Sequence, residues 1–179
     1  MKGIIFNVLE EVVVQQFSQD VWEDLIDKAE VGGAYTSLGN YSDEELASLV
    51  TTSAEVLGKT PGEILRWFGQ SAMPLLATRF PSLFEPHKSS RDFVLSVNKI
   101  IHPEVRKLYA GASCPFFHFK PSDNGSMMMA YHSQRKLCML AQGFIEGAAN
   151  HYHDHADVYH RECMHNGDEK CLLEIKWAA

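Results

Sequence analysis

Apolar residues recur every three or four positions through most of the first 109 residues, which is the spacing of one buried face of an α-helix. The predicted helices begin near Ile4, Ser18, Ser42, Thr60 and Ser89, and Gly32-Gly33 interrupts the series. Ser18 is a typical helix cap. Ser42 followed by Glu45 is typical of a capping box, and Pro61 suits the first position of a helix. The N-terminal part is therefore predicted to be helical.

After Gly111 the pattern changes to short apolar runs separated by turn residues. Strands are predicted over residues 116–119, 127–131, 156–164 and 170–177, and a helix is predicted over residues 137–150. The turn Pro121–Gly125 would join the first two strands, and Asn166-Gly167 is a strong signal for a hairpin between the last two. The sequence thus predicts an α+β fold, in which a helical N-terminal part packs on a C-terminal antiparallel sheet with helices.

Composition and charge narrow the class of protein. The chain has 179 residues, enough for one domain or two closely packed subdomains, and 45% of them are hydrophobic, as in ordinary soluble proteins. A formal net charge of -7 disfavours nucleic-acid binding, because a polyanion would be repelled. No apolar run approaches the ~20 residues of a membrane helix, and the apolar N-terminal stretch lacks a signal-peptide cleavage site. We therefore expect a cytoplasmic protein that binds neither nucleic acid nor a membrane.

His102 precedes a proline near a predicted helix. Pro103 has no N–H group to give to the preceding turn, so the helix must bend, break or begin at this point. A histidine beside such a break is well placed to point one ring nitrogen into a pocket. Taken alone, His102 is equally explained as a partly buried histidine that hydrogen-bonds to backbone.

Tyr131, Ser133 and Arg135 alternate along a predicted strand that leads into a loop, so their side chains are expected on one side of the chain. Three hydrogen-bond donors on one side, including the fixed fork of an arginine, suit a pair of carboxylates or phosphates. A solvated strand edge is the alternative interpretation of these three residues.

The whole chain resembles the heme nitric oxide/oxygen binding (H-NOX) family, which includes the sensor domain of soluble guanylate cyclase. The resemblance rests on His102, on Tyr131-x-Ser133-x-Arg135, and on the stretches Met1–Ile5, Glu104-Val105, Leu108-Tyr109 and Pro115. It implies that His102 is the proximal ligand of a noncovalent b-type heme and that Tyr131, Ser133 and Arg135 bind the heme propionates. It also implies that Pro115 packs against the porphyrin. Covalent attachment is excluded, because the sequence has no Cys-x-x-Cys-His motif.

The same resemblance divides the single domain 1–179 into a distal helical subdomain (about 1–60) and a proximal subdomain with the sheet (about 61–179), with heme between them. Oxygen-binding members of the family have a distal tyrosine that donates a hydrogen bond to bound O2, and the matching residue here is Leu140. The other residues expected on the distal wall are also apolar, and each is equally explained as ordinary core: Ile5, Leu9, Pro74 and Phe144. An apolar pocket favours NO, and CO more weakly, over O2.

The resemblance further implies how the sensor would signal. Binding of NO would release His102 from the iron and let its helix relax, and a partner would detect this change. In bacterial relatives the partner is often a histidine kinase or a cyclic-di-GMP enzyme on a separate chain. The sequence does not decide between these two partners.

Four further residues form a candidate zinc site. Cys138, His160, Cys163 and Cys171 are a Cys3His set suited to tetrahedral zinc. Buried cysteines without a metal are the alternative. A second histidine group, His151, His153 and His155, also alternates, but we interpret it as a polar helix end.

Two other functions remain open at the level of sequence. A heme enzyme such as a peroxidase needs polar acid and base groups near the iron, and the expected distal residues are apolar. We therefore predict that the protein is not an enzyme. A heme-free module that binds a small molecule or a protein would use the same fold, and such a protein would be colourless when purified.

Overall fold

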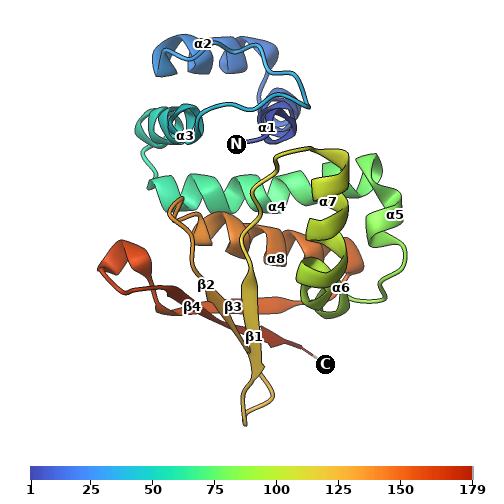
Figure 1. Cartoon of the computed structure of the whole chain (residues 1–179). Helices are drawn as coiled ribbons and strands as arrows, with labels where there is room; N and C mark the ends of the chain where they lie inside the picture. The colour runs from blue at the N-terminus through green and yellow to red at the C-terminus, as the bar shows by residue number, and fades with distance from the viewer. Residues whose placement is uncertain (179) are drawn as a thin grey trace.

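Three N-terminal helices stand together on the long helix α4 (Figure 1). The computed structural model describes residues 1–178, and its first helices are α1 (Gly3–Gln16), α2 (Gln19–Ala29), α3 (Asp43–Leu57) and α4 (Pro61–Arg79). At the start of α4, Thr60 and Glu63 form a complete capping box. The box predicted at Ser42 is only half formed. Ser42 accepts a hydrogen bond from the Glu45 amide, but the Glu45 carboxylate accepts one from the hydroxyl of Tyr35 instead.

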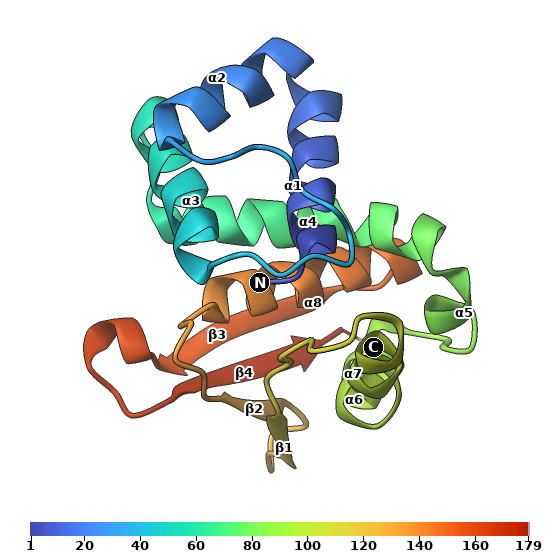
Figure 2. The ribbon, with the colours of Figure 1, turned by 45° about the horizontal axis from the view of Figure 1, so that its top comes forward.

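Helix α8 (Cys138–Tyr152) packs along α4 beneath the N-terminal helices (Figures 1 and 2). The two backbones approach closely because glycines lie at their contact. A Cβ atom added at Gly143 would overlap the carbonyl oxygen of Arg66. One added at Gly69 would lie 2.7 Å from the carbonyl oxygen of Leu140. The α4–α8 pair is the frame against which the other elements pack.

Short helical segments follow α4 and cover one end of this frame. They are α5 (Pro81–Phe84), α6 (Ser90–Ser96), the π-helix η1 (Val97–Ile101) and α7 (His102–Leu108). The amide of His102 donates to the carbonyl of Val97, five residues earlier, and Pro103 has no amide hydrogen to donate. The predicted change in the helix at His102 is therefore confirmed, and it takes the form of a π-turn.

The sheet covers the other side of α8 (Figures 1 and 2). Its strands are β1 (Phe117–Pro121), β2 (Met127–Tyr131), β3 (Ala156–Glu162) and β4 (Cys171–Trp177), and all neighbours in the order β1-β2-β4-β3 are antiparallel. Tyr131 faces Phe117 on β1 and Cys171 on β4. The α+β fold predicted from the sequence is confirmed.

The connection between β3 and β4 differs from the expected tight hairpin. Strand β3 ends at Glu162 rather than near Met164, because Met164–Asn166 form a 3-10 turn. Gly167 then has a φ of 96°, in the left-handed region that favours glycine. The Asn-Gly pair thus ends a wider loop instead of forming the two-residue turn that its sequence predicts.

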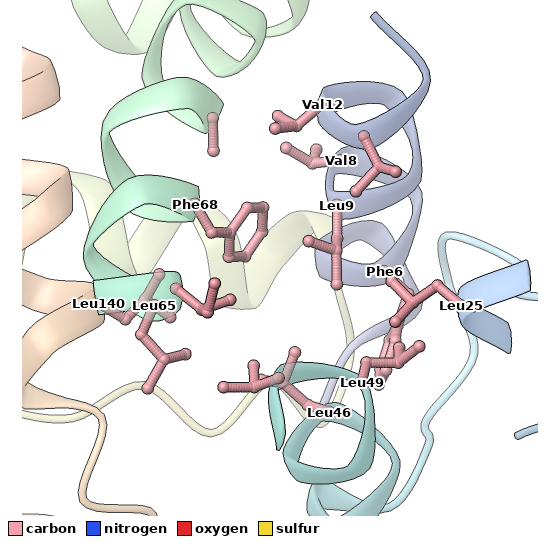
Figure 3. Close-up of a cluster of buried hydrophobic side chains, with 14 of the residues drawn as sticks. Phe6, Val8, Leu9, Val12, Leu25, Leu46, Leu49, Leu65, Phe68 and Leu140 are labelled. Atoms are coloured by element: carbon pink, nitrogen blue, oxygen red, sulfur yellow. The ribbon is translucent and has the colours of Figure 1, made fainter. Parts of the chain in front are cut away.

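Buried side chains form two clusters that share helix α4. The first lies among the N-terminal helices (Figure 3) and includes Phe6, Leu9, Leu49 and Phe68. The second lies between α8 and the sheet and includes Met73, Ile145, Leu173 and Ile175. Since α4 supplies Phe68 to one cluster and Met73 to the other, the two parts of the chain pack on one common element. Within residues 1–178, no helix has the length and apolar character needed to cross a membrane.

Candidate functional site

A largely apolar cavity of about 350 Å³ opens between the α4–α8 frame and the segment that carries η1, α7 and β1. This volume lies within the range of small-molecule and cofactor sites. Ile5 of α1, Leu76 of α4 and Phe144 of α8 line one part of it, and Val97, Ile101 and Phe117 line another. His102, Tyr131, Ser133 and Arg135, which are far apart in the sequence, all border the same cavity.

His102 is the only described residue with a fully buried side-chain polar atom that has no hydrogen-bond partner, and that atom is Nδ1. Burial, reinforced by the nearby positive charge of Arg106, lowers the pKa of His102 to about 4. The imidazole is therefore neutral at physiological pH. The ring of Phe117 lies beside it, with the two ring centres 5.7 Å apart. A neutral, buried imidazole on a cavity wall is the form in which histidine binds a metal.

Tyr131 and Ser133 place two hydroxyl groups at the edge of the cavity. The Tyr131 oxygen accepts a hydrogen bond from the amide of Leu137 at 2.9 Å, and the Ser133 oxygen accepts one from the amide of Arg135 at 3.3 Å. Burial raises the pKa of Tyr131, which keeps its hydroxyl protonated. Both hydroxyls thus accept from the backbone, and each still has a proton to donate toward a ligand.

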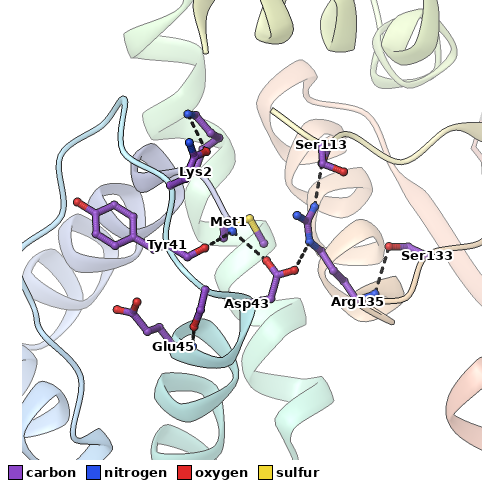
Figure 4. A network of polar contacts seen from close by, with 10 residues as sticks. Met1, Lys2, Tyr41, Asp43, Glu45, Ser113, Ser133 and Arg135 are labelled. Atoms are coloured by element: carbon purple, nitrogen blue, oxygen red, sulfur yellow. Dashed lines mark hydrogen bonds and ion pairs between the residues drawn. The ribbon is translucent and has the colours of Figure 1, made fainter. Parts of the chain in front are cut away.

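Arg135 is held from two sides (Figure 4). Its Nε donates to the Asp43 carboxylate at 2.7 Å, and its Nη1 donates to the carbonyl of Ser113 at 2.8 Å. Burial acts to raise the pKa of Asp43, but hydrogen bonds from Arg135 and the α-ammonium group of Met1 lower it below its ordinary value. The guanidinium is thereby fixed beside the cavity with its Nη2 group free of partners among the described residues.

Lys2 makes a second connection near this network (Figure 4). Its ammonium group is buried and donates to the carbonyl oxygens of Leu38 and Ala110 and to the Asn40 side chain, at 2.8, 3.0 and 2.9 Å respectively. Neither Asp43 nor Lys2 was assigned a specific role from the sequence. Their partners lie up to 108 residues away, so no local pattern could have revealed these contacts.

Three of the five residues expected on the gas-binding wall line the cavity, namely Ile5, Leu140 and Phe144. The expectation for Leu9 is wrong, because its side chain points into the N-terminal core near Phe68 (Figure 3). The expectation for Pro74 is also wrong. Pro74 lies on the other side of α4 and lines a separate surface pocket. Helical spacing marked both residues as apolar, but it did not show which of two buried faces each one occupies.

The cavity fits the cofactor that the sequence resemblance implies. Its apolar walls suit the porphyrin face, and the unpartnered imidazole nitrogen belongs to the residue expected to ligate iron. Pro115 lies on the wall with His102, as expected for a residue that contacts the porphyrin. Tyr131, Ser133 and Arg135 supply donors at one edge, where the two propionate groups need them.

Three thiols meet at a separate place, between α8 and the sheet. The sulfur atoms of Cys138 and Cys163 are 3.8 Å apart, and those of Cys163 and Cys171 are 3.9 Å apart. A tetrahedral zinc ion with bonds of about 2.3 Å holds neighbouring sulfurs about 3.8 Å apart. Burial, together with the neighbouring sulfurs, raises the pKa of Cys138 above its ordinary range. The spacing of the sulfurs therefore fits a metal, and a cation would be needed to make them thiolates.

His160 does not join these sulfurs, so the predicted four-residue set is not assembled in the structure. The described residues that meet there are Cys138, Cys163 and Cys171. The Nε2 atom of His160 instead lies 3.0 Å from the Oε1 atom of Gln142 on α8. The histidines at the end of α8 also stay apart. His151 packs on Phe84 and Tyr152, and exposed His155 pairs with Asp157, which agrees with a polar helix end.

Comparison with known proteins defines the class to which this fold and cavity belong. The profile of the Haem-NO-binding family matches residues 2–160, so the chain belongs to that family. Its members, the H-NOX domains, are heme-binding gas sensors and not enzymes, as the sequence predicts.

Solved structures extend the match over the whole chain. A crystal structure of an H-NOX protein from S. oneidensis in the Fe(II)NO state is 34% identical to this chain, with a TM-score of 0.93 and 100% of both chains covered. An NMR structure of an H-NOX domain from Shewanella oneidensis in the Fe(II)CO state is 35% identical, with a TM-score of 0.89 and 99% of both chains covered. An unliganded Fe(II) H-NOX protein from K. algicida is 24% identical, with a TM-score of 0.88 over 100% of this chain and 97% of its own, and shares the fold.

Proposed function

We propose that the chain is a cytoplasmic nitric oxide sensor that holds a noncovalent b-type heme through His102. The observation that carries this proposal is the neutral, buried imidazole of His102, whose Nδ1 atom has no partner within residues 1–178, on a cavity with an apolar opposite wall. The bound heme would supply ferrous iron with one position open to a diatomic gas. Tyr131, Ser133 and Arg135 would orient it by hydrogen bonds to its propionates.

The choice of gas is supported by the chemistry of the cavity wall. Ile5, Leu140 and Phe144 have no hydrogen-bond donor in their side chains, and bound O2 carries partial negative charge that needs one. NO needs little such help, and CO would bind more weakly than NO. The relatives from Shewanella, described in Fe(II)NO and Fe(II)CO states, support both gases as ligands.

The signal would begin at His102. When NO binds, His102 leaves the iron, and the start of α7 is no longer held against the cavity. The π-turn at residues 97–101 and Pro103 lie at the point that moves, and π-turns occur often at functional sites. A histidine kinase or a cyclic-di-GMP enzyme on a separate chain would detect the new position of α7.

The visible spectrum of the reduced protein tests the heme and gas assignments together. Protein reconstituted with hemin and reduced under nitrogen is expected to show five-coordinate ferrous heme. The spectrum should change with NO and with CO, and air should produce no persistent oxygen complex. A stable oxygen complex would contradict the choice of gas, and a protein that takes up no hemin would instead be the heme-free module.

His102→Gly with added imidazole tests the signalling step. Free imidazole can replace the iron ligand, but it is not attached to α7. We therefore expect the variant to bind heme and NO without changing the activity of the partner enzyme. Regulation that persists in this variant would show that release of His102 is not the signal.

We also propose that Cys138, Cys163 and Cys171 bind a structural zinc ion. The sulfur spacing carries this proposal, and His160 would be the fourth ligand after it leaves Gln142. After dialysis against a chelator of moderate affinity, the protein should retain one zinc per chain. Cys163→Ala should lose the metal, whereas Cys114→Ala, on the cavity wall, should retain it. Wild-type protein without stoichiometric zinc would refute the assignment.

A further inference from the structure

Asn98 lies in the π-turn directly before His102, and its side chain pairs with the backbone of another element. Its Nδ2 atom donates to the carbonyl oxygen of Phe117 at 2.5 Å, and its Oδ1 atom accepts from the amide of Phe117 at 3.1 Å. One carboxamide thus satisfies both backbone groups of one residue. Two hydrogen bonds would have to break before the π-turn could slide along the first residue of β1.

The position of Phe117 gives this pairing a possible consequence for the cavity. β1 is an edge strand, so the Phe117 groups bonded by Asn98 face away from β2, and Asn98 occupies the place of a neighbouring strand. The Phe117 ring lines the cavity and contacts two of its key residues. Its centre is 5.7 Å from that of His102 and 5.8 Å from that of Tyr131.

We propose that Asn98 is a positioning residue that sets the orientation of the His102 imidazole by fixing the π-turn to Phe117. The side chain of Asn98 need not touch the cofactor to act in this way. It fixes the backbone from which His102 projects, and the same contact fixes the ring against which the imidazole lies. This inference rests on the proposed function, because its effect is measured on a bond between His102 and iron.

Asn98→Ala tests the assignment. The variant should bind heme with the wild-type stoichiometry, because Asn98 does not line the cavity. In the ferrous gas-free protein, the iron–histidine stretching band in the resonance Raman spectrum should broaden and move to lower frequency. Release of His102 after NO binding, followed as conversion from a six- to a five-coordinate complex, should accelerate about fivefold, the size expected for the net loss of one hydrogen bond.

Asn124→Ala is the matched control. Asn124 also uses both ends of its carboxamide, since it donates to Glu174 and accepts from the Ser126 amide, but it lies in the β1–β2 turn and does not line the cavity. This variant should lose thermal stability and keep the wild-type Raman band and release rate. A band that shifts equally in both variants would show that general loosening, and not the Asn98 contact, is responsible.

Asn98→Asp covers the case in which the alanine variant does not fold. The carboxylate occupies the same space and still accepts from the Phe117 amide, but its second oxygen faces the Phe117 carbonyl and repels it. The band and the release rate are expected to change in the same direction as for alanine. In heme-free wild-type protein, the Phe117 amide should exchange slowly with solvent, and either substitution should speed its exchange.

The outcomes separate the two proposals. Heme-loaded Asn98 variants with a wild-type band and release rate would overturn the role of Asn98 and leave the sensor function intact. Wild-type protein that binds no hemin would overturn the sensor function, and the role of Asn98 would fall with it. Fast exchange of the Phe117 amide in wild-type protein would overturn the role of Asn98 by itself.

Discussion

The substitution Leu140→Tyr tests the choice of gas at a single side chain. Leu140 borders the cavity from α8, and a tyrosine there would place a hydroxyl donor beside a bound gas. A hydrogen bond to a charged group contributes about 1.5–3 kcal/mol, so O2 should dissociate at least about tenfold more slowly from the variant. Stopped-flow measurement of O2 release checks this. Leu140→Phe, similar in size but without the hydroxyl, should behave like wild type, and equal effects of both substitutions would contradict the argument.

At the scale of residues, the sequence was most informative where a residue type has few other uses in its context. His102 before a proline, and Tyr131, Ser133 and Arg135 at alternate positions, all border one cavity. Leu9 and Pro74 were misplaced because an apolar side chain is equally suited to a core and to a cavity wall. Asp43 was missed as the partner of Arg135, because that contact spans 92 residues.

At the scale of elements, the close contact of α4 and α8 depends on glycine. Gly143→Ala places a Cβ where the Arg66 carbonyl lies, and both atoms belong to helix backbones that cannot easily move. We expect a loss of about 1–3 kcal/mol in the free energy of unfolding, the usual cost of overpacking, measured by urea denaturation. The control is Gly32→Ala, where an added Cβ meets nothing within 4 Å. A Gly143 variant as stable as that control would show that the helices can separate cheaply.

The β1–β2 turn is joined to β4 through a buried carboxylate. Hydrogen bonds from Arg161, Asn124 and Ser126 lower the pKa of Glu174 to about 2, from an ordinary value of 4.5. A lowered pKa stabilises the fold above pH 4.5, and this stabilisation is lost as the pH falls toward 2. The difference in Tm between wild type and Glu174→Gln should therefore be constant near neutral pH and shrink below pH 4.5. A difference independent of pH would contradict the assigned pKa.

Periodicity and capping residues predicted the positions of most elements, because both act within a few neighbouring residues. The π-turn at 97–101 was foreseen only as some change at Pro103, since the residue that pairs with it, Phe117, belongs to a distant strand. The β3–β4 loop differed from the tight hairpin for a similar reason. The Cys163 carbonyl and amide are bonded within the loop to Asn166 and Asp168, which favours the wider turn.

At the scale of the whole molecule, the cavity is formed by segments from both ends of the chain. The α1 helix, the α4–α8 frame and the η1–α7 segment each contribute to its wall, so no single part of the sequence contains the site. Assembly of these segments depends on α4, which supplies side chains to both buried clusters. The sequence predicted that the helical and sheet parts pack together, but it did not identify α4 as the shared element.

The buried ammonium group of Lys2 gives this arrangement a chemical reporter. Amine-reactive reagents modify free lysine ammonium groups, whereas Lys2 is enclosed and bonded to three oxygens. One of these oxygens belongs to Ala110, just beyond α7, so movement of α7 would remove one of the three bonds that protect Lys2. The rate at which Lys2 is acylated, compared with exposed Lys59, would therefore follow the position of α7 in solution without any added probe.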